Sequence, residues 1–325
     1  MKHFVTGGAG FVGRHLVLRL LADGHEVRAL AGSDEEAAAV TALGATPVRA
    51  DLPDLDEVLR GVGIVVNAAM EPSDQGRPGR RERDPVAGTR ALLDAAHRSG
   101  VRRLVHVSTE AVLASGRPLR YVDETAAYPR KHAGEHARTT ALAEQVVLAS
   151  NSRELVTVAV RPRLVWGPGD TELLPQVLAA AEQGRWAWVN GGNHLTSTCH
   201  VRNLCEGIVL AAEKGRGGQA YFLTDGAPVE LRSFLTRCAA AYGVTLPDRS
   251  VPLPVTRTTT TVLEKGRRVL QAKGEPPVAY VAVALGGREV TVDDSRARRE
   301  LGYVPVVTVD EGIEELRELS GPAAS

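Results

Sequence analysis

The sequence has few cysteines, no excess charge of either sign and no long hydrophobic run. Its three cysteines, Cys199, Cys205 and Cys238, form no Cys-x-x-Cys pair, which indicates buried free thiols in a reducing compartment and no metal site. Lysine plus arginine and aspartate plus glutamate number 39 each, so no overall charge favours nucleic acid or an anionic membrane. No run could cross a bilayer and no signal peptide is visible, so we expect a cytoplasmic protein that binds neither nucleic acid nor membrane.

The first 21 residues have the order strand, glycine turn, helix. A short buried strand is predicted over His3–Thr6, glycines follow at Gly7, Gly10 and Gly13, and an apolar-periodic helix is predicted for 11–21. The first glycine allows a tight turn, the second lets a pyrophosphate approach the backbone, and the third lets the helix pack close to the strand. Because the glycines stand between a strand and a helix, we interpret them as a dinucleotide-binding turn.

The ends of the next strands supply further candidates for cofactor binding. The second strand, predicted over Glu26–Ala31, ends without the acidic residue that accepts from a ribose 2′-hydroxyl group, and we expect 34–36 to begin the next helix. Arg14 or Arg28 could reach a 2′-phosphate group, so the sequence weakly favours NADP(H) over NAD(H). Asp51 could accept from the adenine amino group or cap a helix. The candidate set is Gly7, Gly10, Phe11, Val12, Gly13, Arg14, Ser33, Asp51, Leu52, Ala68 and Ala69.

Predicted strands and helices alternate along the chain, which is typical of a doubly wound parallel sheet. We therefore predict an α/β, Rossmann-type domain over residues 1–165, with 196–226 rejoining it. A smaller, interleaved C-terminal substrate lobe is predicted for 166–195 and 227–325. Further strands are predicted at 45–50, 63–69, 103–108, 155–160, 220–224 and 290–292, and further helices at 86–98, 135–149, 200–214, 231–242, 293–301 and 309–319.

Several short motifs together resemble the extended short-chain dehydrogenase/reductase superfamily, in its NAD-dependent epimerase/dehydratase and 3β-hydroxysteroid dehydrogenase branch. They are TGGAGFVG at 6–13, Asp-Leu at 51–52, NAA at 67–69, VST at 107–109, RP at 161–162, WGPG at 166–169, HVRN at 200–203 and YFLTDG at 221–226. The resemblance implies a Rossmann domain that carries a nicotinamide cofactor and a lobe that closes over the substrate. It also implies a possible homodimer formed by paired helices.

The catalytic positions depart from the pattern that the resemblance implies. The family uses a Ser or Thr after the fifth strand, where Thr109 stands, and a Tyr-x-x-x-Lys motif on the following helix. The register of that helix places His136 at the tyrosine position and Thr140 at the lysine position. Tyr128 does not rescue the motif, since His132 and not lysine follows four residues later. The usual relay, in which lysine lowers the tyrosine pKa, therefore cannot be built.

We predict an NAD(P)H-dependent ketoreductase that works by an atypical mechanism on a sizeable apolar ketone, polycyclic or aromatic by the steroid-dehydrogenase resemblance. Thr109 would polarise the carbonyl, His136 or a phenol of the substrate would supply the proton, and Thr140 would bind the ribose. The degraded motif and the same resemblance point to secondary metabolism, such as antibiotic biosynthesis. An apolar pocket, or simply a packed core, is indicated by Leu164, Trp166, Trp186, Trp188 and Leu195.

Two other functions stay open at this stage. A dehydratase, isomerase or epimerase could keep a bound nicotinamide cofactor, although the family's base is missing. Candidate bases are His106, Glu110, His132 and His136, of which His106 lies inside a predicted strand and is expected in the core. A cofactor-binding sensor without turnover would also combine an intact glycine turn with altered catalytic positions.

Overall fold

The computed structural model describes residues 1–49, 55–69, 86–253, 285 and 287–320. Its largest element is a seven-stranded sheet, here called the large sheet, in the order β12-β7-β5-β4-β1-β2-β3. Every neighbouring pair in it is parallel, which confirms the predicted α/β, doubly wound architecture. The strands are β1 (Lys2–Thr6), β2 (Glu26–Leu30), β3 (Thr46–Val48), β4 (Ile64–Asn67), β5 (Arg103–Val107), β7 (Val156–Pro162) and β12 (Gln219–Leu223).

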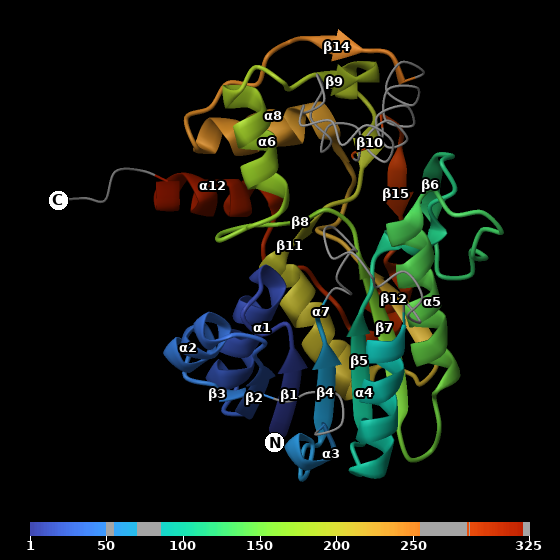
Figure 1. Ribbon diagram of the computed structural model, residues 1–325. Coiled ribbons are helices and arrows are strands. Elements are labelled where there is room, and N and C mark those ends of the chain that lie inside the picture. Colours follow the sequence, from blue (N-terminus) through green and yellow to red (C-terminus); the bar gives the residue numbers. More distant parts are fainter. Residues whose placement is uncertain (50–54, 70–85, 254–284, 286, 321–325) are drawn as a thin grey trace, which may run out of the picture.

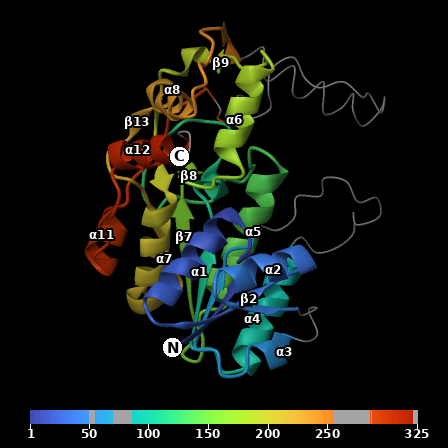
Figure 2. The ribbon, with the colours of Figure 1, turned by 90° about the vertical axis from the view of Figure 1, so that its left-hand side faces the viewer.

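Helices cover both faces of the large sheet, so its central strands are buried on both sides. On one face α1 and α7 pack against each other, and on the other face α4 packs against α5 (Figure 1; Figure 2). Each face has its own apolar core, one around Leu16 and Ile208 and the other around Phe4 and Leu104. The helices are α1 (Phe11–Ala22), α2 (Asp34–Ala42), α3 (Leu55–Val58), α4 (Ala87–Arg98), α5 (Glu135–Ala149), α7 (Val201–Lys214) and α11 (Ser295–Leu301).

A second layer lies beyond the carboxyl ends of the large sheet (Figure 1). Its four-stranded small sheet has the order β13-β10-β15-β6 and is formed by β6 (Leu119–Val122), β10 (Leu195–Thr196), β13 (Val229–Glu230) and β15 (Val290–Val292). Two further strand pairs are β8 (Val165–Trp166) with β11 (Cys199–His200), and β9 (Trp188–Val189) with β14 (Ser250–Val251). The helices of this layer are α6 (Leu173–Glu182), α8 (Leu231–Ala241) and α12 (Val309–Ser320).

The predicted elements are observed with the predicted type and differ at a few ends, whereas α3, α6 and the short strands β6, β8, β10, β11, β13 and β14 were not predicted. The third strand covers only Thr46–Val48, and α11 begins at Ser295 because Asp294 lies at its N-cap. Strand β6 was not predicted, since its sequence LRYV carries no alternating apolar pattern and its partner β15 lies far along the chain. The three cysteines are buried and free, as predicted. Within the described ranges, no helix combines the length and apolarity that a bilayer crossing needs.

Candidate active site

The glycine turn between β1 and α1 leaves no room for side chains. Gly7 has a φ of +68°, and a Cβ there would lie 2.9 Å from the carbonyl oxygen of Ala68. A Cβ on Gly13 would lie 1.9 Å from the carbonyl oxygen of Gly7, so helix and strand can approach only with glycine there. A Cβ on Gly10 would lie 3.3 Å from the carbonyl oxygen of Gly7, which is also a tight contact. The predicted strand-turn-helix context is confirmed.

The first turn of α1 can bind an anion. The first intrahelical hydrogen bond runs from the amide of Arg14 to the carbonyl of Gly10 at 2.9 Å. The preceding amides of Phe11, Val12 and Gly13 therefore have no acceptor within the helix. Free amides at a helix N-terminus that directly follows a glycine turn fit the pyrophosphate of a dinucleotide. The residues of this turn thus fit a nicotinamide dinucleotide cofactor.

The residues at the end of β2 are engaged differently from their prediction. Ser33 caps α2, where its hydroxyl accepts from the amide of Glu36 at 3.2 Å, so 34–36 begin the helix as predicted. Arg14 donates to the carbonyl of Gly169 at 3.0 Å, and Arg28 donates to the carbonyl of Val58 at 3.0 Å. Both arginines proposed for a 2′-phosphate group are therefore bound to protein carbonyls. Asp51 and Leu52 lie outside the described residues.

Arg49 is a basic residue at this position that sequence reasoning missed. The amide of Ala31 donates to the carbonyl of Val48 at 2.9 Å, which brings the residue after β3 beside the end of β2. The Arg49 guanidinium lies 2.8 Å from the Asp34 carboxylate at the start of α2, and its side chain is 53% exposed. Only the pairing of β3 with β2, which a linear sequence does not display, could have identified it.

A buried polar chain runs under the carboxyl edge of β1, β4 and β5. Thr6 donates to the side-chain oxygen of Asn67 at 2.7 Å and accepts from the amide of Ala69 at 3.1 Å. The Asn67 amide nitrogen lies 3.2 Å from Nδ1 of His106. Burial lowers the pKa of His106 to about 4, against a smaller opposing effect of Glu144. His106 is therefore a neutral residue of the interior, as expected, and it fixes the strand ends around Ala69.

Thr109 is part of a three-residue polar cluster at the end of β5. Its hydroxyl donates to the carboxylate of Glu110 at 2.7 Å and accepts from the amide of Ala111 at 3.3 Å. The carboxylate of Glu110 in turn accepts from the guanidinium of Arg163, which follows β7. The proton that was expected to polarise a substrate carbonyl is thus directed toward Glu110. Sequence reasoning had named Glu110 only as a base and had missed Arg163.

His136 and Thr140 lie one turn apart at the start of α5. The His136 side chain is exposed, whereas Thr140 is half-buried. The pKa of Glu172, which precedes α6, is raised by burial and by the Asp170 carboxylate, while His136 acts in the opposite direction. His136 thus lies within electrostatic reach of the loop between β8 and α6, on the side where the second layer meets the large sheet. An exposed imidazole there can exchange protons with solvent.

Tyr128 belongs to a closed ion-pair cluster rather than to a catalytic relay. Its hydroxyl donates to Glu144 at 2.5 Å, and Arg161 donates to the same carboxylate at 2.6 and 2.9 Å. Burial, followed by the charge of Glu144, raises the pKa of Tyr128. The side chains of Arg161 and Glu144 are only 3% and 0% exposed. A tyrosine whose proton is held by a buried carboxylate is a poor proton donor, which agrees with its exclusion from the motif.

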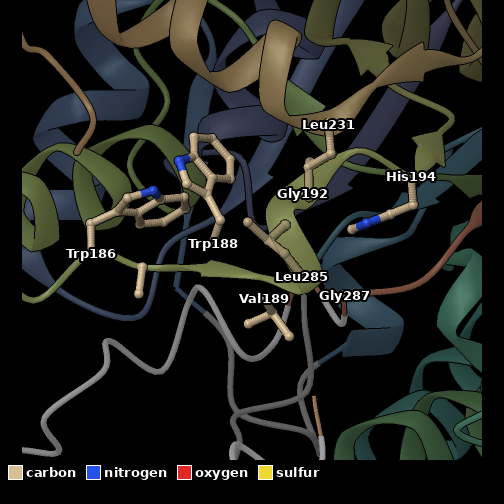
Figure 3. Close-up of a pocket in the computed structure, with 9 residues that line it drawn as sticks. Trp186, Trp188, Val189, Gly192, His194, Leu231, Leu285 and Gly287 are labelled. Carbon is tan, nitrogen blue, oxygen red and sulfur yellow. The ribbon is translucent and has the colours of Figure 1, made fainter. Parts of the chain in front are cut away.

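The tryptophans of the second layer form a packed core. Trp166, Trp186 and Trp188 are all at most 2% exposed, so core packing, and not an open pocket, accounts for them in the described residues. Trp186 and Trp188 meet edge to face at 5.1 Å between ring centroids, and the hollow beside them has a volume of only about 10 Å³ (Figure 3). His194 lines the same hollow from its far side (Figure 3). Leu195 is 39% exposed and takes no part in it.

The parallel sheet, the glycine turn and the polar cluster at the strand ends define a Rossmann-fold oxidoreductase of the short-chain dehydrogenase/reductase type. Residues 4–255 match the 3-beta hydroxysteroid dehydrogenase/isomerase family. The chain belongs to this family, which confirms the superfamily that its motifs resemble.

Similar proteins cover almost the whole chain. A 4-hydroxy-2-methyl-3-oxo-4-farnesyl-3,4-dihydroquinoline-1-oxide ketoreductase from Stigmatella aurantiaca is 46% identical over 99% of this chain and 97% of its own length. A 2-alkyl-3-oxoalkanoate reductase from Stenotrophomonas maltophilia (strain K279a) is 32% identical over 98% of this chain and 99% of its own length. Among solved structures, a dTDP-glucose 4,6-dehydratase from Streptomyces venezuelae with NAD bound is 26% identical, with a TM-score of 0.72, and covers 98% of this chain and 96% of that one.

Proposed function

We propose that the protein is an NADPH-dependent ketoreductase that reduces a ring ketone on a sizeable apolar aromatic substrate. The observation that carries this proposal is the 46% identity, over 99% of the chain, to a ketoreductase whose named substrate is a 3-oxo dihydroquinoline 1-oxide with a farnesyl chain. The intact dinucleotide turn supports it, because Gly13 tolerates no side chain. For this chain the proposed substrate class is a 3-oxo-dihydroquinoline 1-oxide with an apolar side chain.

Each residue of the site has a separate role in the proposed carbonyl reduction. A bound reduced nicotinamide supplies the hydride. The N-terminal turn of α1 holds the pyrophosphate, and Thr140 holds the nicotinamide ribose from α5. His136, one turn earlier on the same helix, donates the proton to the substrate oxygen and recovers it from solvent through its exposed edge. Thr109 orients the carbonyl once its hydroxyl turns away from Glu110. The family's tyrosine and lysine are thereby replaced by an imidazole and a hydroxyl.

A preference for NADPH is proposed on the position of Arg49. Its guanidinium lies at the end of β2, beside the Ser33 cap, where an adenosine ribose lies in this architecture. Arg49→Ala should weaken NADPH binding about tenfold or more and leave NADH binding nearly unchanged, since one charged hydrogen bond to the phosphate is lost. Fluorescence titration of both cofactors measures this. Arg98→Ala, at the far end of α4, is the control, and equal weakening for both cofactors would contradict the assignment.

The catalytic proposal is tested at His136. His136→Phe should slow ketone-dependent NADPH oxidation by about a hundredfold or more and leave NADPH affinity unchanged, because a positioned general acid contributes about that much. His97→Phe, an exposed histidine in the last turn of α4, is the matched control and should retain full turnover. Unchanged turnover in His136→Phe would remove His136 from the mechanism and favour a proton from the substrate itself.

The same assay separates the proposal from its alternatives. Cofactor binding with oxidation of NADPH by 3-oxo substrates supports a reductase. Cofactor binding without NADPH consumption, but with conversion of the substrate, would instead show a dehydratase, isomerase or epimerase. Cofactor binding with no conversion of any 3-oxo substrate would favour a sensor. Size-exclusion chromatography with light scattering tests the proposed homodimer, which is independent of these outcomes.

A further inference from the structure

Two charged residues lie where the large sheet meets the small sheet. Strands β5 and β7 are neighbours, with Val107 paired to Val160. Glu110 and Arg163 each stand three residues beyond this pair, so they meet at the carboxyl edge directly beside Thr109. Ligands of open α/β sheets bind outside this edge.

The guanidinium of Arg163 is fixed on two of its three nitrogens. Its Nη1 donates to the carboxylate of Glu110, and its Nε donates to the hydroxyl of Thr196 on β10, at 3.3 Å. The side chains of Arg163 and Glu110 are 11% and 7% exposed. Within the described part of the chain, Nη2 makes no hydrogen bond. The cluster therefore holds a rigid, nearly buried donor group with one edge still unused.

A purely structural brace explains these features less well. An ion pair of this burial adds little net stability, because desolvation offsets the attraction, so the pair alone does not distinguish a brace from a ligand site. The backbone immediately after Arg163 is also strained, since Leu164 has a φ of +42° although it is not glycine. Strain of this kind costs about 1–3 kcal/mol and is concentrated at functional sites.

Arg163 lies between polar side chains and the aromatic core of the second layer. Burial lowers the pKa of His194, and the charge of Arg163 lowers it further, against a smaller opposing effect of Glu289. The ring of His194 therefore lies within electrostatic reach of Arg163. Both ring nitrogens of His194 are buried and have no hydrogen-bond partner. Its ring also lines the hollow of Trp186 and Trp188 (Figure 3). Arg163 and His194 thus bring polar atoms without partners among the described residues to the border of a packed aromatic core.

We propose that Arg163 is a specificity-determining residue. It binds a second oxygen atom of the substrate, near the ketone that is reduced. This oxygen belongs to a group without net charge and is a strong hydrogen-bond acceptor. Glu110 neutralises the guanidinium, so the cluster has no net charge to attract a carboxylate, whereas Nη2 remains a charged donor for a dipolar oxygen. An N-oxide oxygen has this chemistry. The inference rests on the proposed function and specifies which feature of the ring substrate the site selects.

Equilibrium binding tests this without any turnover. The NADP⁺-loaded protein is titrated, by calorimetry, with 2-methylquinolin-4-ol 1-oxide and with 2-methylquinolin-4-ol, which differ by the oxygen on the ring nitrogen and contain no 3-oxo group to be reduced. The wild-type protein should bind the 1-oxide about tenfold to a hundredfold more tightly, as expected for one hydrogen bond from a charged donor. Equal affinities would overturn the proposal even if ketone reduction is found.

Variants identify the residue responsible. Arg163→Lys and Arg163→Gln should bind both probes equally, at the affinity that the wild-type protein shows for 2-methylquinolin-4-ol. Arg120→Gln, which removes an exposed partner of Glu289 on the other side of the small sheet, should keep the full preference. Glu110→Gln should raise the affinity for a 3-oxoalkanoate, because the guanidinium charge is no longer neutralised. If Arg163→Lys keeps the wild-type preference for the 1-oxide, or if Arg163→Gln weakens both probes by the same factor, Arg163 is only a brace and the inference is wrong.

Discussion

Arg161 and Arg163 stand two residues apart at the end of β7, and each is paired with a glutamate, yet their surroundings differ. Arg161 donates twice to Glu144, and its guanidinium lies over the rings of Tyr128 and Phe222 at 5.5 and 5.4 Å. Arg163 donates once to Glu110 and reaches across to Thr196 in the small sheet. The first pair is enclosed within the layer formed by α5 and the large sheet. The second pair bridges two sheets. Each arginine keeps one nitrogen without a partner among the described residues, but that of Arg161 is buried inside its layer, whereas that of Arg163 lies at the carboxyl edge of the large sheet.

This difference teaches that the chemistry of a buried ion pair does not by itself identify its role. The closed pair fills its surroundings with aromatic faces and a tyrosine hydroxyl, so no ligand can approach it. The open pair lies beside the strained Leu164 and the unpartnered His194. We therefore expect substitutions at the closed pair to change stability and substitutions at the open pair to change specificity.

The largest effect on stability is expected at the closed pair. Glu144→Gln leaves the buried guanidinium of Arg161 without a counter-charge and should lower the free energy of unfolding by about 3–5 kcal/mol. Denaturant unfolding measures this change. The fraction that remains folded should keep its turnover, because the Glu144 side chain is fully buried. A loss below 1 kcal/mol would show that water reaches this pair and would remove the distinction between the two.

Acid should lower the free energy of unfolding through protonation of the buried His106. Burial lowers its pKa in the folded protein to about 4 from 6.5, so the unfolded chain binds the proton more readily. This stability is present above about pH 6.5 and is lost as the pH falls toward 4, by about 3 kcal/mol in total. Unfolding of the wild type and of His106→Asn across this range measures the slope, which should be shallower in the variant. His97→Asn, at a histidine in the last turn of α4, is measured beside it as the control for the substitution itself.

A smaller effect on stability is expected at the open pair. Glu110→Gln should lower the free energy of unfolding by about 1–2 kcal/mol, because the guanidinium of Arg163 keeps its bond to Thr196 and its side chain is partly exposed to solvent. The comparison with Glu144→Gln in the same unfolding assay is the direct test. A cost equal to that of Glu144→Gln would make both pairs structural.

A similarly small effect is expected at Tyr128. Tyr128→Phe removes the hydrogen bond to Glu144 and the bond that the tyrosine oxygen accepts from Arg161 at 3.2 Å, and it should cost about 1–2 kcal/mol, since both bonds from Arg161 to Glu144 remain. Turnover of NADPH with a 3-oxo substrate should not change. Loss of turnover at unchanged stability would mean that this tyrosine takes part in proton transfer after all.

Local pattern was enough to predict the cofactor half of the molecule. The glycine turn and α1 are defined by neighbouring residues, and apolar runs such as 63–69 show the buried strands of the large sheet. The cluster at the open pair depends on tertiary contacts between residues up to 53 positions apart, since Arg163 joins Glu110 to Thr196. No local pattern carries that information, and β6 was missed for the same reason. Arg49 likewise became visible only through the pairing of β3 with β2.

From the sequence alone, the tryptophans could line a pocket or fill a core, and the structure shows that they fill a core. Apolar residues that line a pocket and apolar residues that fill a core have the same sequence pattern. Trp166 donates to Asp225 at 2.8 Å and packs against Phe234, and this contact identifies it as part of the core of the second layer. His136 and Thr140 were placed by a family register, and their positions one turn apart on α5 leave their roles to the tests above.

The middle position of β15 in the small sheet has a consequence for synthesis of the chain. Strands β6 and β10 are not neighbours, and each pairs with β15. The small sheet therefore cannot form until residues 290–292 have been synthesised. The glycine turn and its contacts at Ala68 and Ala69, by contrast, are complete within the first 69 residues. As the nascent chain leaves the ribosome, the residues of the glycine turn therefore emerge long before β15, the strand that joins β6 to β10.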